Sequence, residues 1–475
     1  MSEFSELPSI PDPPNHMSSD EFRTNGYALI DWLAKYVEDV ENFPVYSRAK
    51  PGDIAAMLPD EAPEQGESFD ALLQDLDDVV IPGITHWQSP NWFAFFPANS
   101  SPPSVLAEMA SAGLGVQGML WSTSPAATEI ESRVLDWLVD LHDLPQPWKN
   151  TGPGGGVIQM SASDSTLTAL VVARHRARDK GPAGAMVVYV SSQAHSSAEK
   201  GCTVAGIGHC RVVDVDDVLA MDPAALDRQI EADISDGLIP IAVISTVGST
   251  GTNAIDPIDE INDILESRDM WHHVDAAYAG NAMICEEFRR HVPDLERVDS
   301  YTFNPHKWMM VNFDCNIFWV ADRKPLIDTL SIVPPYLRND ASDAGAVIDY
   351  RDWHVPLGRR FRALKLWWVI RSYGAEGIRA LIRHHVALAD RFAGLVEADE
   401  RFELFAPHPL ALVSFVHRDG DEATRALAHA LNASGRVAVT PSDIGGVAFI
   451  RVSVGQTRST TEHVDHLWEL IDTLA

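Results

Sequence analysis

The chain has 475 residues, of which 45% are hydrophobic and only 22% are charged. This composition can bury a large core, which excludes a disordered protein, and the length suggests two or three domains. The 68 Asp and Glu residues outnumber the 36 Lys and Arg residues, and the formal net charge is −32. This acidic excess argues against binding to nucleic acid or to an anionic membrane surface, because both need cationic patches.

The four cysteines form no CxxC pair and no metal-binding spacing, so we expect reduced thiols, a cytoplasmic protein and no metal site. No apolar run approaches the ~20 residues that a membrane-spanning helix needs. The acidic, proline-rich start does not resemble a signal peptide. The acidic excess with scarce lysine fits either a salt-rich cytoplasm or an ordinary acidic protein from a high-GC genome, and the dependence of activity on salt would separate the two.

The first hundred residues are expected to be mainly helical. Apolar side chains at helical spacing predict one amphipathic helix over residues 18–38 and a second helix over residues 69–80. A stretch rich in proline, glycine and acidic residues, 48–66, predicts a loop between them. Residues 85–103 place five aromatic side chains among turn residues, which favours core packing over a pocket wall.

After a helix that starts near Ser124-Pro125, short β-rich runs alternate with helical segments. This alternation predicts a largely parallel sheet with helices on both faces. The predicted strands are residues 186–190, 211–215, 239–246, 271–274, 300–303 and 317–320. The predicted helices include residues 167–178, 224–233 and 258–267, with another helical stretch from Gly358. Residues 402–417, 423–434 and 447–454 predict a small α+β domain.

Several familiar motifs are absent or incomplete. The glycine-rich residues 152–156 lack the GxGxxG spacing and are not followed by Gly-Lys-Ser/Thr, so they do not indicate a nucleotide site. Ser197-Ala-Glu-Lys200 lacks the companion motifs of Ser-x-x-Lys enzymes. No Gly-x-Ser-x-Gly and no His-Glu-x-x-His occurs, which leaves the hydrolase and zinc-peptidase hypotheses without support.

Three chemically active groups each follow a predicted strand. Asp275 follows residues 271–274, Lys307 follows residues 300–303, and Ser161 follows an apolar run and opens a helix. In an open α/β sheet, ligands bind beyond the carboxyl ends of the strands. We therefore expect all three groups to face one crevice.

Pyridoxal 5'-phosphate (PLP) chemistry needs these three groups together. A lysine amine forms a Schiff base with the cofactor, a carboxylate holds the ring nitrogen protonated, and a helix N-terminus binds the phosphate. The spacing therefore predicts Lys307 as the Schiff-base lysine and Asp275 as the ring partner. Singly, each group has a plainer explanation, since such an Asp is more often a turn residue and such a Lys more often lies on the surface.

Six ordered segments resemble the aromatic L-amino-acid decarboxylases, which are group II PLP-dependent decarboxylases of fold type I. They are residues 82–90, 154–163, 273–280, 303–308, 311–315 and 356–361. The resemblance implies an α/β fold of the PLP-dependent transferase type I, with a mostly parallel seven-stranded sheet covered by helices on both faces. It also implies a helical N-terminal segment over residues 1–100 that clasps a partner, a PLP-binding domain over 101–372 and a small α+β domain over 373–475.

The resemblance also implies roles for single residues. His195 matches a histidine that stacks on the cofactor ring, Ala277 matches the residue on the opposite ring face, and Thr246 matches a residue near the phenolic oxygen. The matching phosphate cradle consists of Ser161, Ala162, Ser163, Asn304 and His306. Tyr336 matches a tyrosine on a mobile loop that reaches the partner's active site and protonates Cα after CO2 leaves.

The substrate pocket is expected to be aromatic. The matching wall positions are Trp87, Phe95, Phe96, Pro97 and Phe313, with Gln117 and Met119 donated by the other subunit. None of these residues is basic, which argues against glutamate or aspartate as the substrate, whereas aromatic walls suit an aromatic ring. Gly358 matches a position where glycine accompanies indole substrates in plant relatives. Phe95, Gln117 and Met119 depart from some relatives, so the preference for a ring hydroxyl stays open.

The sequence therefore predicts a homodimeric carboxy-lyase that converts aromatic L-amino acids of the tryptophan, DOPA, tyrosine or phenylalanine type to the arylalkylamine and CO2. The alternative is an aromatic acetaldehyde synthase of the same family, which consumes O2. Tyr336 and His195 favour the decarboxylase, because their replacement by Phe or Asn marks the oxidative branch. A PLP-binding scaffold without activity is disfavoured by the joint presence of Lys307, Asp275 and His195.

Overall fold

The computed structural model describes residues 16–332 and 347–475. The chain forms two compact units, one that ends at His86 and one that runs from Trp87 to Ala475. The predicted division into three parts, with boundaries after residues 100 and 372, stays a prediction.

The first unit is helical, as predicted. Its elements are α1 (Ser19–Asp39), η1 (Val40–Asn42), η2 (Ala55–Met57), α2 (Phe69–Asp75), the π-helical η3 (Leu76–Val80) and α3 (Ile81–Gly83). Ser18 begins α1 with a capping box in which its side chain accepts the N–H of Glu21. No residue of α1 is buried, and Phe22 and Tyr27 are 60% and 63% exposed. The N-terminal part of the apolar face of α1 is therefore exposed, whereas Tyr36 near its end packs against Phe43 and His86.

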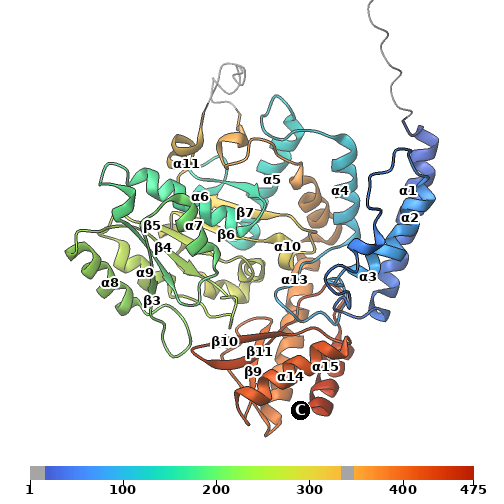
Figure 1. The fold of residues 1–475 in the computed structure, drawn as a ribbon. Helices are drawn as coiled ribbons and strands as arrows, with labels where there is room; N and C mark the ends of the chain where they lie inside the picture. The colour runs from blue at the N-terminus through green and yellow to red at the C-terminus, as the bar shows by residue number, and fades with distance from the viewer. Residues whose placement is uncertain (1–15, 333–346) are drawn as a thin grey trace, which may run out of the picture. The chain divides into compact units, whose positions relative to one another are not determined.

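A seven-stranded sheet forms the centre of the second unit (Figure 1). Its strands are β1 (Gly155–Gln159), β2 (Met186–Ser191), β3 (His209–Val213), β4 (Ile239–Thr246), β5 (Trp271–Asp275), β6 (Ser300–Phe303) and β7 (Asn316–Val320). The spatial order is β1-β7-β6-β5-β4-β2-β3. Only β7 runs antiparallel to its neighbours, since the other paired strands are parallel. The mostly parallel seven-stranded sheet is therefore confirmed.

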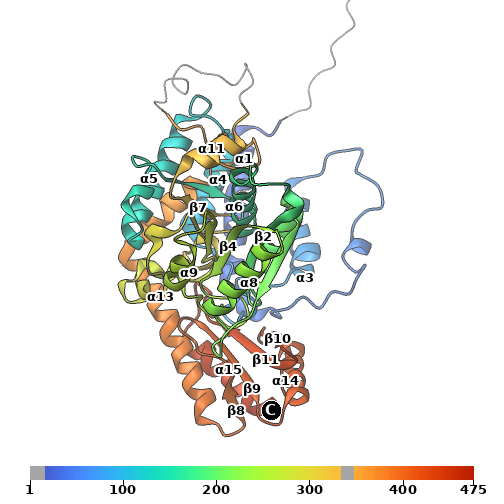
Figure 2. The ribbon, with the colours of Figure 1, turned by 90° about the vertical axis from the view of Figure 1, so that its left-hand side faces the viewer.

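Helices cover both faces of this sheet (Figure 2). Alternate residues of a strand point to opposite faces, and in the central strands the residues on both faces are buried beneath these helices. Val188 packs in a cluster with residues of α6 and α7, whereas Val187 packs with residues of α8 and α9. The helices are α4 (Pro102–Leu114), α5 (Pro125–His142), α6 (Ala162–Arg176), α7 (Ser197–Ala205), α8 (Pro223–Ser235), α9 (Ile258–Leu265), α10 (Pro305–Trp308) and α11 (Arg323–Leu330). Short 3₁₀ helices are η4 (Gln146–Trp148), η5 (Ala183–Ala185), η6 (Ala279–Ile284), η7 (Glu286–His291), η8 (Leu295–Arg297) and η10 (Tyr350–Asp352).

A second, antiparallel sheet lies near the end of the chain, as the α+β pattern predicted. Its order is β10 (Thr440–Ile444), β11 (Val447–Ser453), β9 (Leu412–His417) and β8 (Phe402–Leu404). The helices α14 (Asp421–Ser434) and α15 (Thr461–Leu474) follow β9 and β11 in the chain. The long α13 (Arg362–Ala398) precedes this sheet and contains Gly374 in a non-helical conformation.

The helix expected from Gly358 begins only at Arg362, because Arg359 enters a buried ion pair. An Arg359 guanidinium nitrogen lies 2.6 Å from Glu131 Oε1, and the two side chains are 2% and 3% exposed. Arg359 also donates to the carbonyls of Ile158, at 2.9 Å, and Gly118, at 3.3 Å. The removal of one partner from such a pair costs about 3–5 kcal/mol. The pair therefore anchors the end of β1, which leads directly to Ser161.

All four cysteines, Cys202, Cys210, Cys285 and Cys315, are free thiols, and only Cys210 is partly exposed. No helix among residues 16–332 and 347–475 is long and apolar enough to cross a membrane. The same ranges contain no group of three or more His, Cys, Asp or Glu side chains placed to hold a metal ion.

Candidate active site

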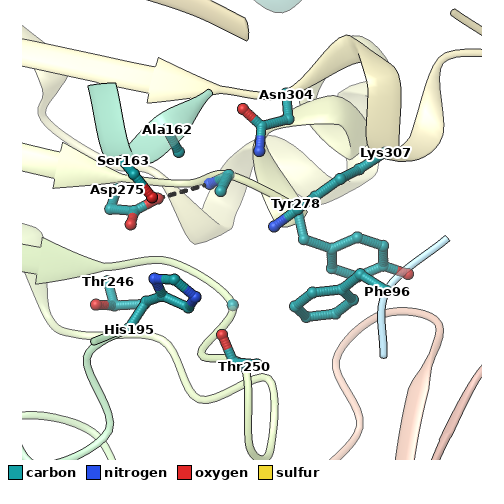
Figure 3. Close-up of a pocket in the computed structure, with 12 residues that line it drawn as sticks. Phe96, Ala162, Ser163, His195, Thr246, Thr250, Asp275, Tyr278, Asn304 and Lys307 are labelled. Atoms are coloured by element: carbon teal, nitrogen blue, oxygen red, sulfur yellow. Dashed lines mark hydrogen bonds between the residues drawn. The ribbon is translucent and has the colours of Figure 1, made fainter. Parts of the chain in front are cut away.

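A pocket opens at the carboxyl ends of the central parallel strands (Figure 3). It gathers the ends of β4 and β5, the residues that follow β6, the start of α6 and the loop before α7. Its lining residues are Phe96, Ala162, Ser163, His195, Thr246, Gly248, Thr250, Asp275, Ala277, Tyr278, Asn304 and Lys307. Asp275 and Lys307, which the sequence placed after separate strands, therefore do meet, together with Ala162 and Ser163, the two residues that follow Ser161.

Asp275 is the last residue of β5 and the one acidic residue among the described residues that line the pocket. The residue is 7% exposed, and its carboxylate accepts the N–H of Ala277 at 3.0 Å, drawn as the dashed line in Figure 3. This bond leaves oxygen lone pairs available to a cationic donor in the pocket.

Lys307 reaches the pocket from the short helix α10, which follows β6 and begins with Pro305 at its first position. Its Nζ lies 4.8 Å from the centre of the Phe96 ring. Burial lowers the pKa of the amine to about 8, with Asp275 opposing that shift and the positive charge of Arg451 adding to it. At pH 7 about a tenth of the amine is therefore uncharged and nucleophilic, roughly two orders of magnitude more than for an ordinary lysine.

Arg451, on β11, is a buried cation next to this pocket. It is 3% exposed, and it donates to the carbonyls of Gly251, at 3.1 Å, and Phe95, at 3.2 Å. Its guanidinium carbon lies 5.4 Å from the centre of the Phe96 ring. Burial lowers its pKa to about 10, so the group is still charged at neutral pH. The sequence analysis did not single out Arg451, because no local motif surrounds it.

His195 lies in the loop between β2 and α7. Its Nδ1 accepts the backbone N–H of Ser197 at 3.2 Å and lies 2.8 Å from the Ser197 hydroxyl. Because Nδ1 accepts, the neutral ring carries its proton on Nε2. Partial burial lowers the pKa of His195, with the nearby charge of Asp275 opposing and that of Lys307 adding to the shift. The ring therefore offers the pocket an N–H donor at neutral pH.

The first turn of α6 has the features that an anion site needs. Ser161 begins the helix as its N-cap, with its hydroxyl accepting the N–H of Asp164 at 3.3 Å. Ala162 and Ser163 line the pocket, and so does the amide of Asn304. Backbone N–H groups in the first turn of a helix lack intrahelical acceptors and carry the positive end of the helix dipole. This arrangement suits a phosphate group.

Thr246 was expected in the site, and the loop that follows it adds two lining residues, Gly248 and Thr250, that the sequence analysis missed. Thr246 ends β4, and its buried hydroxyl has no hydrogen-bond partner in the described part of the chain. Gly248 has φ +80°, and a Cβ there would lie 2.7 Å from both Ala279 Cβ and Asn253 Oδ1. The turn therefore requires glycine and brings Thr250 into the pocket. The Gly-Ser-Thr composition directly after a predicted strand was the signal for this loop.

Tyr278 is a further unpredicted member of the pocket and forms an aromatic stack. Its ring centre lies 4.1 Å from that of Phe96 on one side and 4.6 Å from that of Trp308 on the other. Trp308 in turn donates from Nε1 to His385 Nδ1 at 2.8 Å. The stack therefore holds the aromatic side of the pocket rigidly against α13.

Comparisons with known proteins identify the family. The conserved domain of pyridoxal-dependent decarboxylases matches residues 51–418. Tryptophan decarboxylase 2 of Oryza sativa subsp. japonica is 43% identical over 469 residues, 96% of this chain and 94% of that protein. Phenylacetaldehyde synthase of Arabidopsis thaliana is 42% identical over 469 residues, 96% of each chain. The crystal structure of Oryza sativa TDC with PLP and tryptamine has a TM-score of 0.95 at 39% identity, and the match covers 97% of this chain and 99% of that one.

The chain belongs to the pyridoxal-dependent decarboxylase family. The resemblance stated from its sequence motifs is confirmed, and so is PLP fold type I. The protein is thus a carboxy-lyase whose cofactor is PLP.

The residues present fit PLP. An amine of lowered pKa, a carboxylate, an unpaired threonine hydroxyl and the N-terminus of a 15-residue helix converge on one pocket. These groups match an aldehyde, a protonated ring nitrogen, a phenolic oxygen and a phosphate. Lys307, Asp275, Thr246 and the first turn of α6 are therefore the groups that would hold the cofactor of this decarboxylase.

Two members of the predicted phosphate cradle lie outside the pocket lining. Ser161 uses its hydroxyl as the cap of α6. His306 is 5% exposed, and its Nδ1 accepts the N–H of Cys315 at 3.0 Å. Burial lowers the pKa of His306 to about 3, with the charge of Lys307 adding to the shift, so the ring is neutral. Their role in binding phosphate stays a prediction.

Of the predicted substrate residues, only Phe96 lines the pocket within one chain of the decarboxylase. Trp87 and Phe95 instead pack with Trp92, with ring centres 4.3 to 6.0 Å apart. Phe95 is 50% exposed and has φ +54°, and its N–H donates to Thr440 Oγ1 at 2.6 Å. Pro97 packs closely on Gly455, where a Cβ would lie 2.5 Å from Pro97 Cγ.

The remaining predicted substrate residues lie elsewhere in the chain. Phe313 is 66% exposed and stands edge-on to the His306 ring at 4.8 Å. A Cβ at Gly358 would lie 3.6 Å from Gln117 Oε1, so these two positions are adjacent. The carbonyl of Met119 accepts the N–H of Arg351 at 3.0 Å. Tyr336 lies outside the described residues. The substrate roles of all these residues stay predictions.

We expect Lys307 of the apoenzyme to react with acetic anhydride along a titration curve with its midpoint near pH 8, because burial lowers its pKa. An ordinary lysine side chain titrates near 10.4, about 2 units higher. Competitive labelling with Nα-acetyl-lysine as the internal standard, followed by mass spectrometry of the Lys307 peptide, measures the midpoint. A midpoint equal to that of the standard would contradict the burial argument.

Proposed function

We propose that this decarboxylase converts aromatic L-amino acids of the tryptophan, tyrosine, DOPA or phenylalanine type to the arylalkylamine and CO2. The observation that carries the proposal is the convergence of Lys307, Asp275 and His195 on one pocket beside the stacked rings of Phe96 and Tyr278. The similarity to relatives named for tryptophan and tyrosine decarboxylation supports it.

Each group in the pocket has a role in this proposal. Lys307 would hold the cofactor covalently through its amine, Asp275 would accept a hydrogen bond from the protonated ring nitrogen, and the first turn of α6 and Asn304 would bind the phosphate. Bound PLP would supply an electron sink for the pair of electrons that departing CO2 leaves behind. Ala277 and His195 line the same pocket and would contact the cofactor ring.

His195 also acts on the substrate. Its Nε2–H, held in place by the two contacts of Nδ1 with Ser197, is a donor for the substrate carboxylate. This hydrogen bond orients the bond that breaks. Thr246 and Thr250 add hydroxyls to the pocket, and that of Thr246 would serve the phenolic oxygen of the cofactor.

The aromatic preference follows from the lining. Phe96 and Tyr278 offer ring faces, and stacking on them contributes roughly 0.5–1.5 kcal/mol per pair beyond area burial. Among the residues that the structure describes, Lys307 and His195 are the basic members of the lining, and both are engaged by the reaction itself. The neighbouring Arg451 already donates to two backbone carbonyls, so a second substrate carboxylate finds no uncommitted basic residue in this lining, which argues against acidic amino acids.

A panel of amino acids tests the proposal directly. We expect CO2 release and equimolar arylalkylamine from at least one of tryptophan, tyrosine, DOPA and phenylalanine, and none from glutamate or aspartate. The Lys307→Ala variant is the control, and it should lose activity together with the peptide that borohydride links to PLP. CO2 release from glutamate alone would overturn the aromatic assignment.

The alternative is an aromatic acetaldehyde synthase, because a relative at 42% identity carries the name phenylacetaldehyde synthase. Such an enzyme consumes O2 and releases ammonia, hydrogen peroxide and an aldehyde in place of the amine. His195 and Tyr336 favour the amine-forming reaction, with Tyr336 as the acid that protonates Cα.

We expect Tyr336→Phe to shift the product from amine toward aldehyde and hydrogen peroxide, because the variant keeps the ring and loses the acidic hydroxyl. Oxygen-electrode and peroxide assays run beside an amine assay measure the shift, and the conservative Tyr350→Phe variant, in η10, is the matched control. An unchanged amine yield in Tyr336→Phe would contradict the proposed role.

We further propose a homodimer with shared active sites. The described structure leaves apolar surface uncovered on α1 and on α4, where Leu106, Met109 and Leu114 are 46%, 43% and 63% exposed. Most of the predicted substrate residues do not line the pocket of their own chain. A second copy that covers α4 and donates Gln117 and Met119 would account for both features.

We expect light scattering after size-exclusion chromatography to give twice the chain mass at submicromolar concentration. A mixture of Lys307→Ala chains with inactive Met119→Asp chains should regain part of the activity after subunit exchange, because one of the two sites in each mixed dimer is then intact. Full activity in a monomer would exclude shared sites.

We also propose a cytoplasmic location. The support is the presence of four free cysteines, which is typical of a reducing compartment. Cell fractionation with immunodetection tests it, and recovery with a membrane or secreted fraction would overturn it.

A further inference from the structure

A buried polar network lies behind the phosphate end of the pocket, and Asn316 is its centre. Asn316 is the first residue of β7 and is fully buried. Its register partner across the sheet is Gln159, the last residue of β1. Because β7 alone runs antiparallel, its first residue lies at the edge of the sheet where β1 and β6 end. Asn316 thus lies behind the residues that line the pocket.

Hydrogen bonds determine the orientation of the Asn316 amide. Its Nδ2 lies 3.1 Å from the carbonyl oxygen of Phe303, which can only accept, so this atom has to be the nitrogen. The same nitrogen lies 2.8 Å from Thr302 Oγ1, and that hydroxyl gives its own proton to the carbonyl of Ile317 at 2.7 Å. On the other side, Asn316 Oδ1 accepts from the hydroxyl of Ser165 on α6.

The orientation of Asn316 in turn determines that of Asn304, which lines the pocket. Asn316 Nδ2 lies 2.6 Å from Asn304 Oδ1. A reversed Asn304 would place two NH2 groups against each other at this distance, which is repulsive. The Asn304 oxygen therefore faces Asn316, and its nitrogen faces the other way, on the side of Lys307 in Figure 3.

We propose that Asn316 is a positioning residue that holds the Asn304 amide with its NH2 group toward the pocket, so that Asn304 donates to the phosphate of PLP. The proposal rests on the proposed function, in which Asn304 belongs to the phosphate site. Asn316 itself touches neither cofactor nor substrate.

The chemistry of the ligand makes this orientation matter. A phosphate dianion offers only acceptors, so an amide that presented its oxygen would repel it. An asparagine without a fixed neighbour presents either end. Asn316 removes that freedom before the ligand arrives, and preorganised donors bind more tightly than those that must reorient.

The Asn316→Asp variant tests the proposal with almost no change in shape. At pH 8 the introduced carboxylate is an acceptor, so Asn304 turns to donate to it and presents Oδ1 to the pocket. The measured quantity is the ratio of the dissociation constants of pyridoxal and PLP for the apoenzyme, since pyridoxal lacks the phosphate. We expect this ratio to fall at least ~10-fold, as for the loss of a charge-assisted hydrogen bond.

Three further variants separate positioning from general damage. Gln159→Glu introduces a carboxylate into the same buried network without touching Asn304, and it should leave the ratio unchanged. Asn304→Ala should lower the ratio as much as Asn316→Asp does, and the double variant should lower it no further. Asn316→Ser, which is neutral and shorter, should give a smaller fall and replaces Asn316→Asp if that variant does not fold.

The outcomes distinguish the inference from the proposed function. Two results would overturn the positioning role while the phosphate site stands. One is a wild-type ratio in Asn316→Asp, and the other is a lower ratio in the variant that carries both Asn304→Ala and Asn316→Asp than in Asn304→Ala alone. A wild-type ratio in Asn304→Ala would overturn both, because Asn304 would then not bind the phosphate. If Gln159→Glu lowered the ratio as much as Asn316→Asp does, the effect would come from any charge in the network, and Asn316 would have no specific positioning role.

Discussion

The burial of one lysine amine is the constraint on which the rest of the site depends. Lys307 is buried because β6 ends at Phe303 and the short helix α10 begins at Pro305, within the core. The ring of Phe96, rather than water, lies against the amine. Desolvation penalises the charged form, so the same burial lowers the pKa of the amine to about 8. A single structural fact thus supplies both the position and the reactivity of the nucleophile.

Strand direction explains why its partners are nearby. The parallel strands β4, β5 and β6 deliver their last residues to one edge of the sheet, and Thr246, Asp275 and Asn304 come from those ends. The antiparallel β7 delivers its first residue to the same edge, which is how Asn316 reaches the back of the site. One reversed strand therefore lets two neighbouring strands contribute to the same polar network.

The sequence alone was sufficient to predict the site residues that lie at the ends of strands. Asp275 and Lys307 each follow an apolar run, and β4 and β6 lie where the β-rich runs were predicted, so the local pattern carried the information. Thr250, Tyr278 and Arg451 were missed, because their place in the site depends on a glycine turn, a ring stack and a strand from the end of the chain. Trp87 and Phe95 were matched to a pocket wall, yet in one chain they pack with Trp92. Contacts between residues far apart in sequence leave no periodic signal.

The charges around the pocket oppose those of the chain as a whole. The net charge is −32, yet Lys307, Arg451 and the N-terminus of α6 lie at a pocket in which Asp275 is the one acidic lining residue in the described part of the chain. In a partly dry pocket such fixed positive groups act over several ångströms with little screening. They favour the two anionic groups that the reaction brings in, a phosphate and a substrate carboxylate. An acidic protein therefore needs these few buried cations and oriented donors, because its surface field repels the ligands that it binds.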